Sequence, residues 1–212
     1  MQRRTITRTL LGVIAAAGIG AFAGATSAPI ESAAPSAKVG APAPAFKLTD
    51  LQGKEHTLAD FKGKTVVLEW FCSGCPWSGK SSPRSVHTTG QVKNLIADIK
   101  KIDPNAVYIL VDSTANMPKD KVIDTDKRLK AEWGLTAPIL IDYDGKVGKA
   151  YGAQTTPHMF VIDKEGVLRY QGAFGDRKKE NYVLNAVKAV NAGEEPKPAT
   201  TKAWGCGVKY KR

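Results

Sequence analysis

The sequence contains few residues that can bind a metal or form disulfides, with three cysteines and three histidines among 212 residues. An odd number of cysteines leaves at least one thiol outside any intramolecular disulfide. There is no internal repeat, no nucleic-acid-binding motif and no basic helix face. The formal charge of +11 therefore indicates a solvated basic surface, and no nucleic-acid partner is expected.

The N-terminus has the pattern of an export signal. Arg3 and Arg4 precede an uncharged run of small and apolar residues at 10–25, which is followed by small-x-small cleavage sites. Residues 3–8 resemble a twin-arginine signal, and an ordinary secretory signal is the alternative. We expect residues 1–28 to be a signal peptide and the mature protein to be periplasmic or secreted. No stable membrane insertion is expected after signal removal, and no lipid anchor, because no cysteine follows the apolar run.

Composition divides the rest of the chain into three parts. Residues 29–44 are rich in Ala, Pro and Ser and predict a flexible linker. Residues 45–193 predict one folded domain, and residues 194–212 a basic tail that carries Cys206. Within the domain, apolar runs typical of strands alternate with helical periodicity. The pattern predicts an α/β fold whose central mixed β-sheet is flanked by helices, with an N-terminal β-hairpin extension.

The main chemical signal is a pair of cysteines after a buried strand. The run Val66–Phe71 is β-branched and aromatic, and Cys72 and Cys75 follow it. Pro76 suits the first turn of a helix, so we expect a helix to begin there. A thiol at a helix N-terminus faces free N–H groups and the positive end of the dipole, which favour the reactive thiolate. The sequence therefore points to redox chemistry at sulfur.

Three segments carry a resemblance to a known family. They are residues 39–48, residues 53–68 and residues 155–163 with the glycine at 166. The chain resembles the thioredoxin-like superfamily in its redoxin branch, which includes peroxiredoxins and thiol-disulfide oxidoreductases. The segments 75–77 and 204–206 look most like a peroxiredoxin-like subgroup with alkyl hydroperoxide reductase and thiol-specific antioxidant domains. The resemblance implies a thioredoxin-like fold, and a cis Pro157 beside the active thiol, with Thr156 placed to pair with substrate.

Two assignments of the attacking cysteine compete. Either Cys72 attacks and Cys75 is its partner, or Cys75 attacks from the start of the helix. We favour Cys75, in which case Ser78 stands where relatives carry their second cysteine. Cys206 is a possible resolving thiol, provided that a mobile tail brings it back to Cys75. A static disulfide remains the structural alternative.

Further residues have candidate roles near the thiols. Glu69 lies within the buried strand and is either a proton shuttle or a solvated residue at a sheet edge. Trp70 and Trp77 are candidate substrate contacts, although packing explains them equally well. The peroxiredoxin pattern is incomplete, because its Pro and Thr positions hold Leu68 and Cys72.

We expect an exported thiol-dependent oxidoreductase that acts by thiol-disulfide exchange without a cofactor. Its partners would be a protein or small-molecule disulfide or peroxide and an external thiol reductant. Peroxide reduction by a peroxiredoxin-like mechanism is one alternative. A metal-binding chaperone that uses Cys72, Cys75 and His158 as ligands is another.

Overall fold

The computed structural model describes residues 37–80, 82–177 and 180–211. The predicted signal peptide lies outside the described residues. The described part contains four α-helices, one 3-10 helix and nine strands. In chain order they are β1 Lys47–Asp50, β2 Glu55–Thr57, η1 Leu58–Phe61, β3 Val66–Phe71, α1 Gln91–Ile102, β4 Val107–Asp112, α2 Lys119–Glu132, β5 Ile139–Ile141, α3 Lys146–Tyr151, β6 Thr155–Thr156, β7 His158–Ile162, β8 Leu168–Gly172, α4 Tyr182–Asn191 and β9 Cys206–Gly207.

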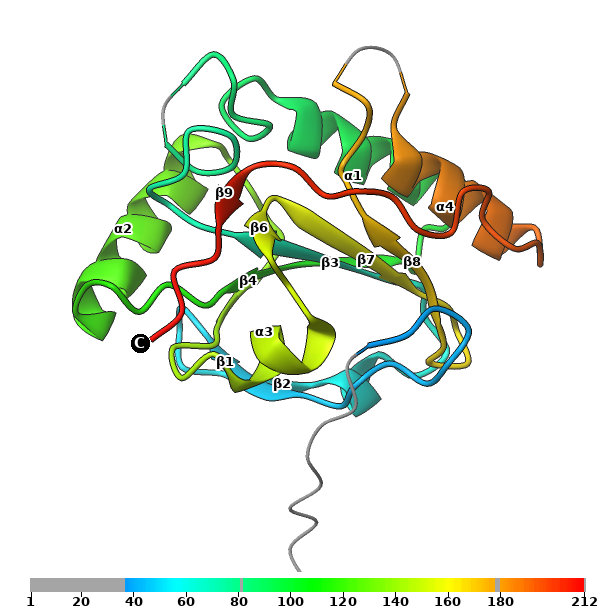
Figure 1. The fold of residues 1–212 in the computed structure, drawn as a ribbon, viewed down its shortest axis with the longest axis horizontal. Helices are drawn as coiled ribbons and strands as arrows, with labels where there is room; N and C mark the ends of the chain where they lie inside the picture. Colours follow the sequence, from blue (N-terminus) through cyan, green and yellow to red (C-terminus); the bar gives the residue numbers. More distant parts are fainter. Residues whose placement is uncertain (1–36, 81, 178–179, 212) are drawn as a thin grey trace, which may run out of the picture. The chain divides into compact units, whose positions relative to one another are not determined.

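Seven of these strands form one mixed sheet in the order β2-β1-β5-β4-β3-β7-β8. The three strands β3, β4 and β5 run parallel, and β7 lies antiparallel to both β3 and β8. The predicted N-terminal hairpin joins this sheet through the antiparallel pair β1–β5. This is the thioredoxin-like fold with a central mixed sheet, as predicted (Figure 1).

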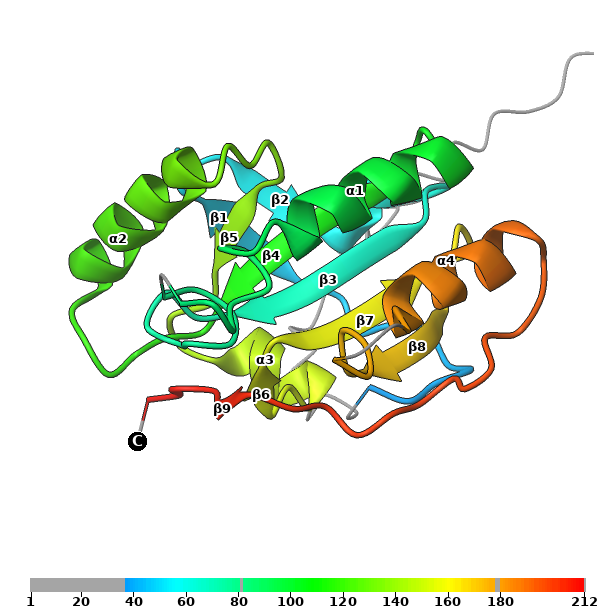
Figure 2. The same ribbon diagram turned by 90° about the horizontal axis from the view of Figure 1, so that it is seen from above.

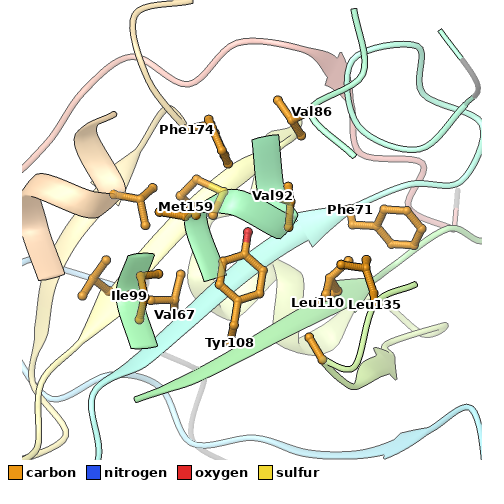
Figure 3. Close-up of a cluster of buried hydrophobic side chains, with 14 of the residues drawn as sticks. Val67, Phe71, Val86, Val92, Ile99, Tyr108, Leu110, Leu135, Met159 and Phe174 are labelled. Carbon is orange, nitrogen blue, oxygen red and sulfur yellow. The ribbon is translucent and has the colours of Figure 1, made fainter. Parts of the chain in front are cut away.

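Helices cover both faces of the sheet, and the alternation of β3 shows why. Val67 and Phe71 join a cluster that includes buried residues of α1, α2 and α4, whereas Leu68 and Trp70 join one that includes Tyr151 of α3. Figure 2 shows α1 and α4 side by side over one face, and Figure 3 shows the first cluster around Tyr108 and Met159. Successive side chains of a strand point to opposite faces, so a strand between two layers buries both sets of side chains, and in β3 all of them except Glu69 are apolar.

The helices follow the local sequence signals closely. In α1 the buried residues Val92, Leu95 and Ile99 repeat at helical spacing. At the start of α4 the Asn181 side chain accepts a hydrogen bond from the Leu184 N–H at 3.0 Å, a standard N-cap. Helix α2 begins directly after Pro118. Among the described residues, no helix has the length and apolar character needed to cross a membrane.

The predicted helix from Pro76 is wrong. The described residues between Cys75 and α1 form turns, and α1 is the first helix after β3. The backbone N–H groups of Ser78, Gly79 and Lys80 all donate to the carbonyl of Cys75, at 3.2, 2.8 and 2.8 Å. Bonds that converge on one oxygen close a tight turn and do not propagate a helical ladder. Pro83 then removes a donor that a continuing helix would need.

The C-terminal segment packs along the domain instead of extending from it. Thr201 and Gln171 bond through their backbones, and the Thr201 hydroxyl accepts a 2.8 Å hydrogen bond from the Ala173 N–H. The chain then pairs with β6 through β9 (Figure 1), and the Tyr210 hydroxyl donates to the Ala153 carbonyl at 2.8 Å. The segment that carries Cys206 is thus packed along the domain, and the thiol lies near Cys75 in this arrangement.

Candidate active site

All three cysteines line one small cavity where β3 ends. The cavity has a volume of about 120 Å³, and Cys72, Cys75 and Cys206 share its wall with Met117 and Lys209. All three thiols are free; Cys72 and Cys75 are buried, and Cys206 is partly exposed. The fold therefore brings together every sulfur nucleophile of the chain, including the one that lies far away in the sequence.

The turn after β3 positions Cys75. The Cys75 N–H donates to the Cys72 carbonyl at 3.0 Å, and the chain then folds back so that Gly79 lies against Cys72. A Cβ atom at position 79 would lie 2.2 Å from the Cys72 carbonyl oxygen, so only glycine allows this close approach. The turn presents the Cys75 sulfur to the loop before Pro157.

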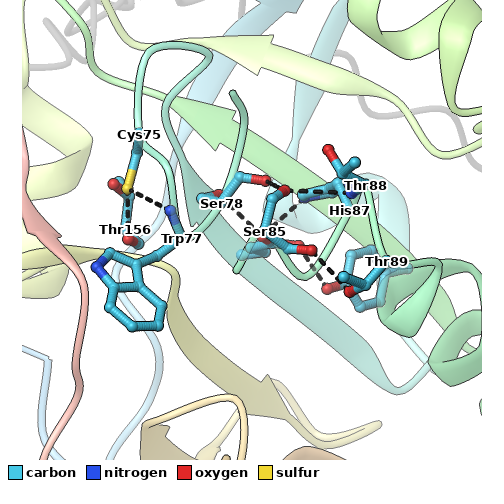
Figure 4. A network of polar contacts seen from close by, with 10 residues as sticks. Cys75, Trp77, Ser78, Ser85, His87, Thr88, Thr89 and Thr156 are labelled. Atoms are coloured by element: carbon cyan, nitrogen blue, oxygen red, sulfur yellow. Dashed lines mark hydrogen bonds and ion pairs between the residues drawn. The ribbon is translucent and has the colours of Figure 1, made fainter. Parts of the chain in front are cut away.

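Polar groups of two loops surround the Cys75 sulfur. The thiol donates to the Thr156 carbonyl at 3.1 Å, and the Trp77 N–H donates to the sulfur at 3.4 Å (Figure 4). The Thr156–Pro157 peptide bond is cis, as predicted from the resemblance. The cis-proline segment therefore lies directly beside this thiol.

The Cys75 pKa lies below the ordinary value of a thiol. Burial is the largest influence and raises the pKa. Side-chain hydrogen bonds from Thr156 and Cys206, with backbone N–H groups of Trp77 and Cys206, stabilise the thiolate and outweigh burial. Since no helix begins at Pro76, these donors take the place of the helix N-terminus that the sequence predicted.

Strand β9 places Cys206 against this sulfur. Cys206 pairs with Thr156 in the antiparallel β6–β9 ladder. Gly205 makes the approach possible, because a Cβ there would lie 2.1 Å from the Thr156 carbonyl oxygen. Burial, the hydrogen bond to Cys75 and the charges of Cys75 and Cys72 raise the Cys206 pKa to about 11. Cys206 therefore acts as the thiol donor, and Cys75 is the acceptor whose sulfur ionises more readily.

Cys72 has the opposite electrostatic environment from Cys75. Burial raises its pKa, and the negative charge of Asp112 raises it further. Asp112 lies within a buried carboxyl pair with Asp126, and burial raises their pKa values to about 6 and about 9. Two neighbouring carboxyl groups in a buried site share a proton because both cannot ionise. Cys72 is therefore the less nucleophilic thiol of the motif.

No motif in the sequence predicts the proximity of these two carboxyl groups. Asp112 does accept a 2.6 Å hydrogen bond from the Thr114 N–H. The sequence feature that could have indicated a buried carboxyl group is Asp126. It lies on the buried face of α2 together with Val122 and Leu129. Among the described residues neither Asp126 oxygen has a hydrogen-bond partner, so burial, together with the neighbouring charge of Asp112, favours the protonated carboxyl group and raises its pKa.

Glu69 is the centre of a separate buried network. It is completely buried on a central strand, so the interpretation as a solvated edge residue is wrong. His87 contacts one oxygen at 2.9 Å, Ser78 donates to the same oxygen at 3.4 Å, and Tyr108 donates to the other at 2.6 Å (Figure 4 shows the serine and histidine side). Burial followed by the Glu69 charge raises the Tyr108 pKa well above its usual value. The network joins β3, β4 and the loop that follows Cys75.

The structure separates the two candidate tryptophans. Trp70 is fully buried between Tyr151 and Phe160, and its indole N–H donates to Ser113 at 3.1 Å. The prediction that Trp70 contacts substrate is therefore wrong. Trp77 is partly exposed and lies on the surface next to Cys75.

The structure also shows where the predicted site residues Thr156 and His158 lie. Thr156 is buried, and β9 occupies its strand edge. His158 is buried with a pKa lowered to about 4 by burial, and its ring accepts the Gln154 N–H at 3.2 Å. Among the described residues, no group of three or more His, Cys, Asp or Glu side chains is arranged to hold a metal ion.

A thioredoxin-like sheet with a cysteine of lowered pKa beside a cis-proline is the arrangement of a class of thiol oxidoreductases. The Redoxin family model matches residues 38–190. The chain belongs to the redoxin family and is an oxidoreductase.

Curated relatives are thiol-disulfide oxidoreductases. The chain is 33% identical over 168 residues to thiol-disulfide oxidoreductase ResA of Geobacillus kaustophilus, which covers 79% of this chain and 86% of the relative. It is 30% identical over 143 residues to ResA of Bacillus anthracis, a match that covers 68% of this chain and 73% of the relative. These relatives support thiol-disulfide exchange as the type of reaction.

Solved structures share the fold. A hypothetical protein of Sinorhizobium meliloti matches with a TM-score of 0.70 at 24% identity, covering 83% of this chain and 96% of that one. An uncharacterized conserved protein of Geobacillus kaustophilus matches with a TM-score of 0.68 at 22% identity. The match covers 82% of this chain and 93% of that one.

Proposed function

We propose that this protein is an exported thiol-disulfide oxidoreductase in which Cys75 is the attacking thiolate and Cys206 the resolving thiol. The observation that carries the proposal is the position of the Cys75 sulfur, in contact with both Thr156 and Cys206. Cys72, with its raised pKa, is a neighbour of this pair and not its nucleophile.

The reaction proceeds in two exchanges. The Cys75 thiolate attacks one sulfur of a substrate disulfide, the substrate S–S bond breaks, and the leaving thiolate takes up a proton. Cys206 then loses its proton and attacks the Cys75 sulfur, which releases the second substrate thiolate and forms a Cys75–Cys206 disulfide. Two electrons have passed to the substrate, and an external dithiol returns the pair to the reduced state. The opposite net direction uses the same steps in reverse.

The electrostatics suit this order of events. A thiol with a lowered pKa attacks first because more of it is thiolate, and Cys206, with a pKa of about 11, stays protonated until the mixed disulfide removes the neighbouring negative charge. Lys209 lowers the Cys206 pKa through its charge and favours the second thiolate. Glu69 is held by Ser78, His87 and Tyr108, and we assign it a supporting role in the loop that carries Cys75.

Single cysteine replacements test the assignment. The reduced mature protein is mixed with a small disulfide, quenched and mapped by mass spectrometry. We expect a Cys75–Cys206 disulfide in the wild type, a trapped mixed disulfide on Cys75 in Cys206→Ser, no reaction in Cys75→Ser, and wild-type products in Cys72→Ser. A Cys72–Cys75 disulfide in the wild type would assign the resolving role to Cys72. Replacing the disulfide by hydrogen peroxide tests the alternative oxidant.

Export is supported by the N-terminal pattern and remains to be measured. Expression of the full chain in a bacterial host, followed by cell fractionation and mass determination of the N-terminus, tests it. A product that begins near residue 28 in the extracytoplasmic fraction is expected. An uncleaved product confined to the cytoplasm would contradict export.

A further inference from the structure

A groove beside the Cys75 site has no role in the exchange steps described above. It has a volume of about 630 Å³, within the range of ligand pockets, and lies between the turn after β3, α1, α4 and the loop before α4. Trp77 and Trp204 line its wall, and Leu95 and Leu184 contribute apolar surface. None of the residues that line this groove is a cysteine. The groove lies next to the segments that carry two of the thiols, because the Trp77 N–H donates to the Cys75 sulfur and Trp204 precedes Cys206 by two residues.

Two arginines define the chemistry of this groove. The Arg84 guanidinium lies 5.6 Å from the Trp77 ring centre, and that of Arg177 lies 5.3 Å from Trp77 and 5.4 Å from Trp204. Within the described residues neither arginine forms an ion pair with a carboxylate. A guanidinium stacked on an aromatic face keeps its N–H edge available for a carboxylate.

The acidic side chains of the groove have partners of their own. Asp98 accepts a 2.7 Å contact from Lys101, and Glu180 accepts a hydrogen bond from Asn185 at 3.3 Å. The hydrogen bond from Asn185 leaves the charge of Glu180 in place, so the positive charge of the groove is local. It lies where the two guanidinium groups stack on Trp77, whose backbone N–H contacts the Cys75 sulfur.

The backbone at Arg177 adds an independent observation. Arg177 has φ of 64°, and it is the one non-glycine with positive φ within the residues that the structure describes. This conformation is unfavourable for an L-residue with a long side chain and concentrates at functional positions. Here it coincides with the stacking of the guanidinium over the two indole rings.

The strand edge next to Cys75 narrows the choice of substrate. In the reduced protein, β9 pairs with Thr156 and occupies the backbone edge beside Pro157. An extended polypeptide therefore finds this edge taken, whereas the arginine groove stays open.

We propose that this groove binds the carboxylate groups of a low-molecular-weight anionic disulfide and delivers its sulfur to Cys75. The inference rests on the proposed exchange reaction and adds the substrate class to it. Arg84 and Arg177 are binding residues in this proposal, and Trp77 and Trp204 hold their guanidinium groups in place.

Three small disulfides of different charge test the proposal. Oxidised glutathione carries carboxylates, cystamine is cationic, and 2-hydroxyethyl disulfide is neutral. Stopped-flow measurements give the second-order rate constant of the reduced protein with each. We expect the ratio of the glutathione rate to the neutral rate to fall about fivefold for each of Arg84→Gln and Arg177→Gln, the change that corresponds to about 1 kcal/mol per ion pair. The wild-type preference for glutathione over cystamine should weaken as salt is added.

Arg128→Gln is the matched control, because it removes the same charge from the exposed face of α2, which does not line the groove. It should leave the ratio unchanged. Two outcomes would overturn this inference while leaving the exchange reaction intact. One is a wild-type rate constant for oxidised glutathione about equal to that for cystamine. The other is a fall in the glutathione-to-neutral ratio in Arg128→Gln as large as in the groove variants. Failure of all three disulfides to react with Cys75 would overturn the proposed function and this inference together.

Discussion

Replacing Gly205 by alanine should separate Cys206 from Cys75 without unfolding the domain. The new Cβ would lie 2.1 Å from the Thr156 carbonyl oxygen and 2.7 Å from its carbon. Both partners are backbone atoms, so no side chain can rotate away. Gly205 also has φ of 135°, a conformation that L-residues rarely adopt.

The magnitude follows from the two penalties and from the contacts that oppose them. Overpacking costs about 1–3 kcal/mol, and the unfavourable backbone conformation costs about 1–3 kcal/mol. Near this position the segment is held by hydrogen bonds from the Val208 N–H to Gln154 and from the Trp204 indole to Gly175, each worth about 1 kcal/mol. The penalty therefore equals or exceeds what holds the strand locally, and β9 should leave β6.

The assay is the rate at which one equivalent of a small disulfide produces the Cys75–Cys206 disulfide. The summed penalty of about 2–6 kcal/mol, set against about 2 kcal/mol of holding contacts, reduces the docked population, and hence this rate, at least about twofold and about 30-fold for an excess of about 2 kcal/mol. Gly207→Ala is the matched control, since a Cβ at that position meets its nearest atom, the Gln154 oxygen, at 4.0 Å. Unchanged disulfide formation in Gly205→Ala would refute the argument that β9 positions the resolving thiol.

Three further predictions follow from buried groups. Gly79→Ala places a Cβ 2.2 Å from the Cys72 carbonyl oxygen and should lower stability by about 1–3 kcal/mol in urea unfolding, with slower alkylation of the reactive thiol; an unchanged unfolding midpoint would contradict it. Burial raises the pKa of Asp112 to about 6 and of Asp126 to about 9, both above the value in the unfolded chain. The unfolded chain therefore loses these protons at lower pH than the folded protein, and the free energy of unfolding should fall as pH rises from about 4 to about 9. Asp126→Asn should flatten this fall between pH 7 and 9, and a slope equal to that of the wild type would refute it. Glu69→Leu leaves buried donors without their acceptor and should cost about 2–5 kcal/mol, more than Glu69→Gln, as measured by denaturant midpoints.

The sequence by itself predicted most of the regular structure. Strand β3, helix α1 and the N-terminal hairpin lie where the apolar pattern placed them. These elements are encoded locally, because a strand buried on both faces is mostly apolar and a helix repeats its buried residues every three or four positions. The cis form of Pro157 was also predicted, although from the family resemblance and not from local propensity.

Local signals failed where distant backbone decides the conformation. Pro76 and the residues after it favour a helix, yet the close contact between Gly79 and Cys72 folds them into turns. The burial of Asp126 beside the charge of Asp112 depends on how α2 packs against β4. Neither contact leaves a periodic pattern in the sequence.

Only the tertiary structure supports the proposed pairing of Cys75 with Cys206. The sequence placed Cys72 and Cys75 three residues apart and left Cys206 in a basic tail. The structure pairs β9 with β6, so that Cys206 lies against Cys75 while Asp112 suppresses ionisation of Cys72. A thiol's reactivity depends on the donors and charges around its sulfur, and here those groups come from four separate segments that meet only in the folded chain.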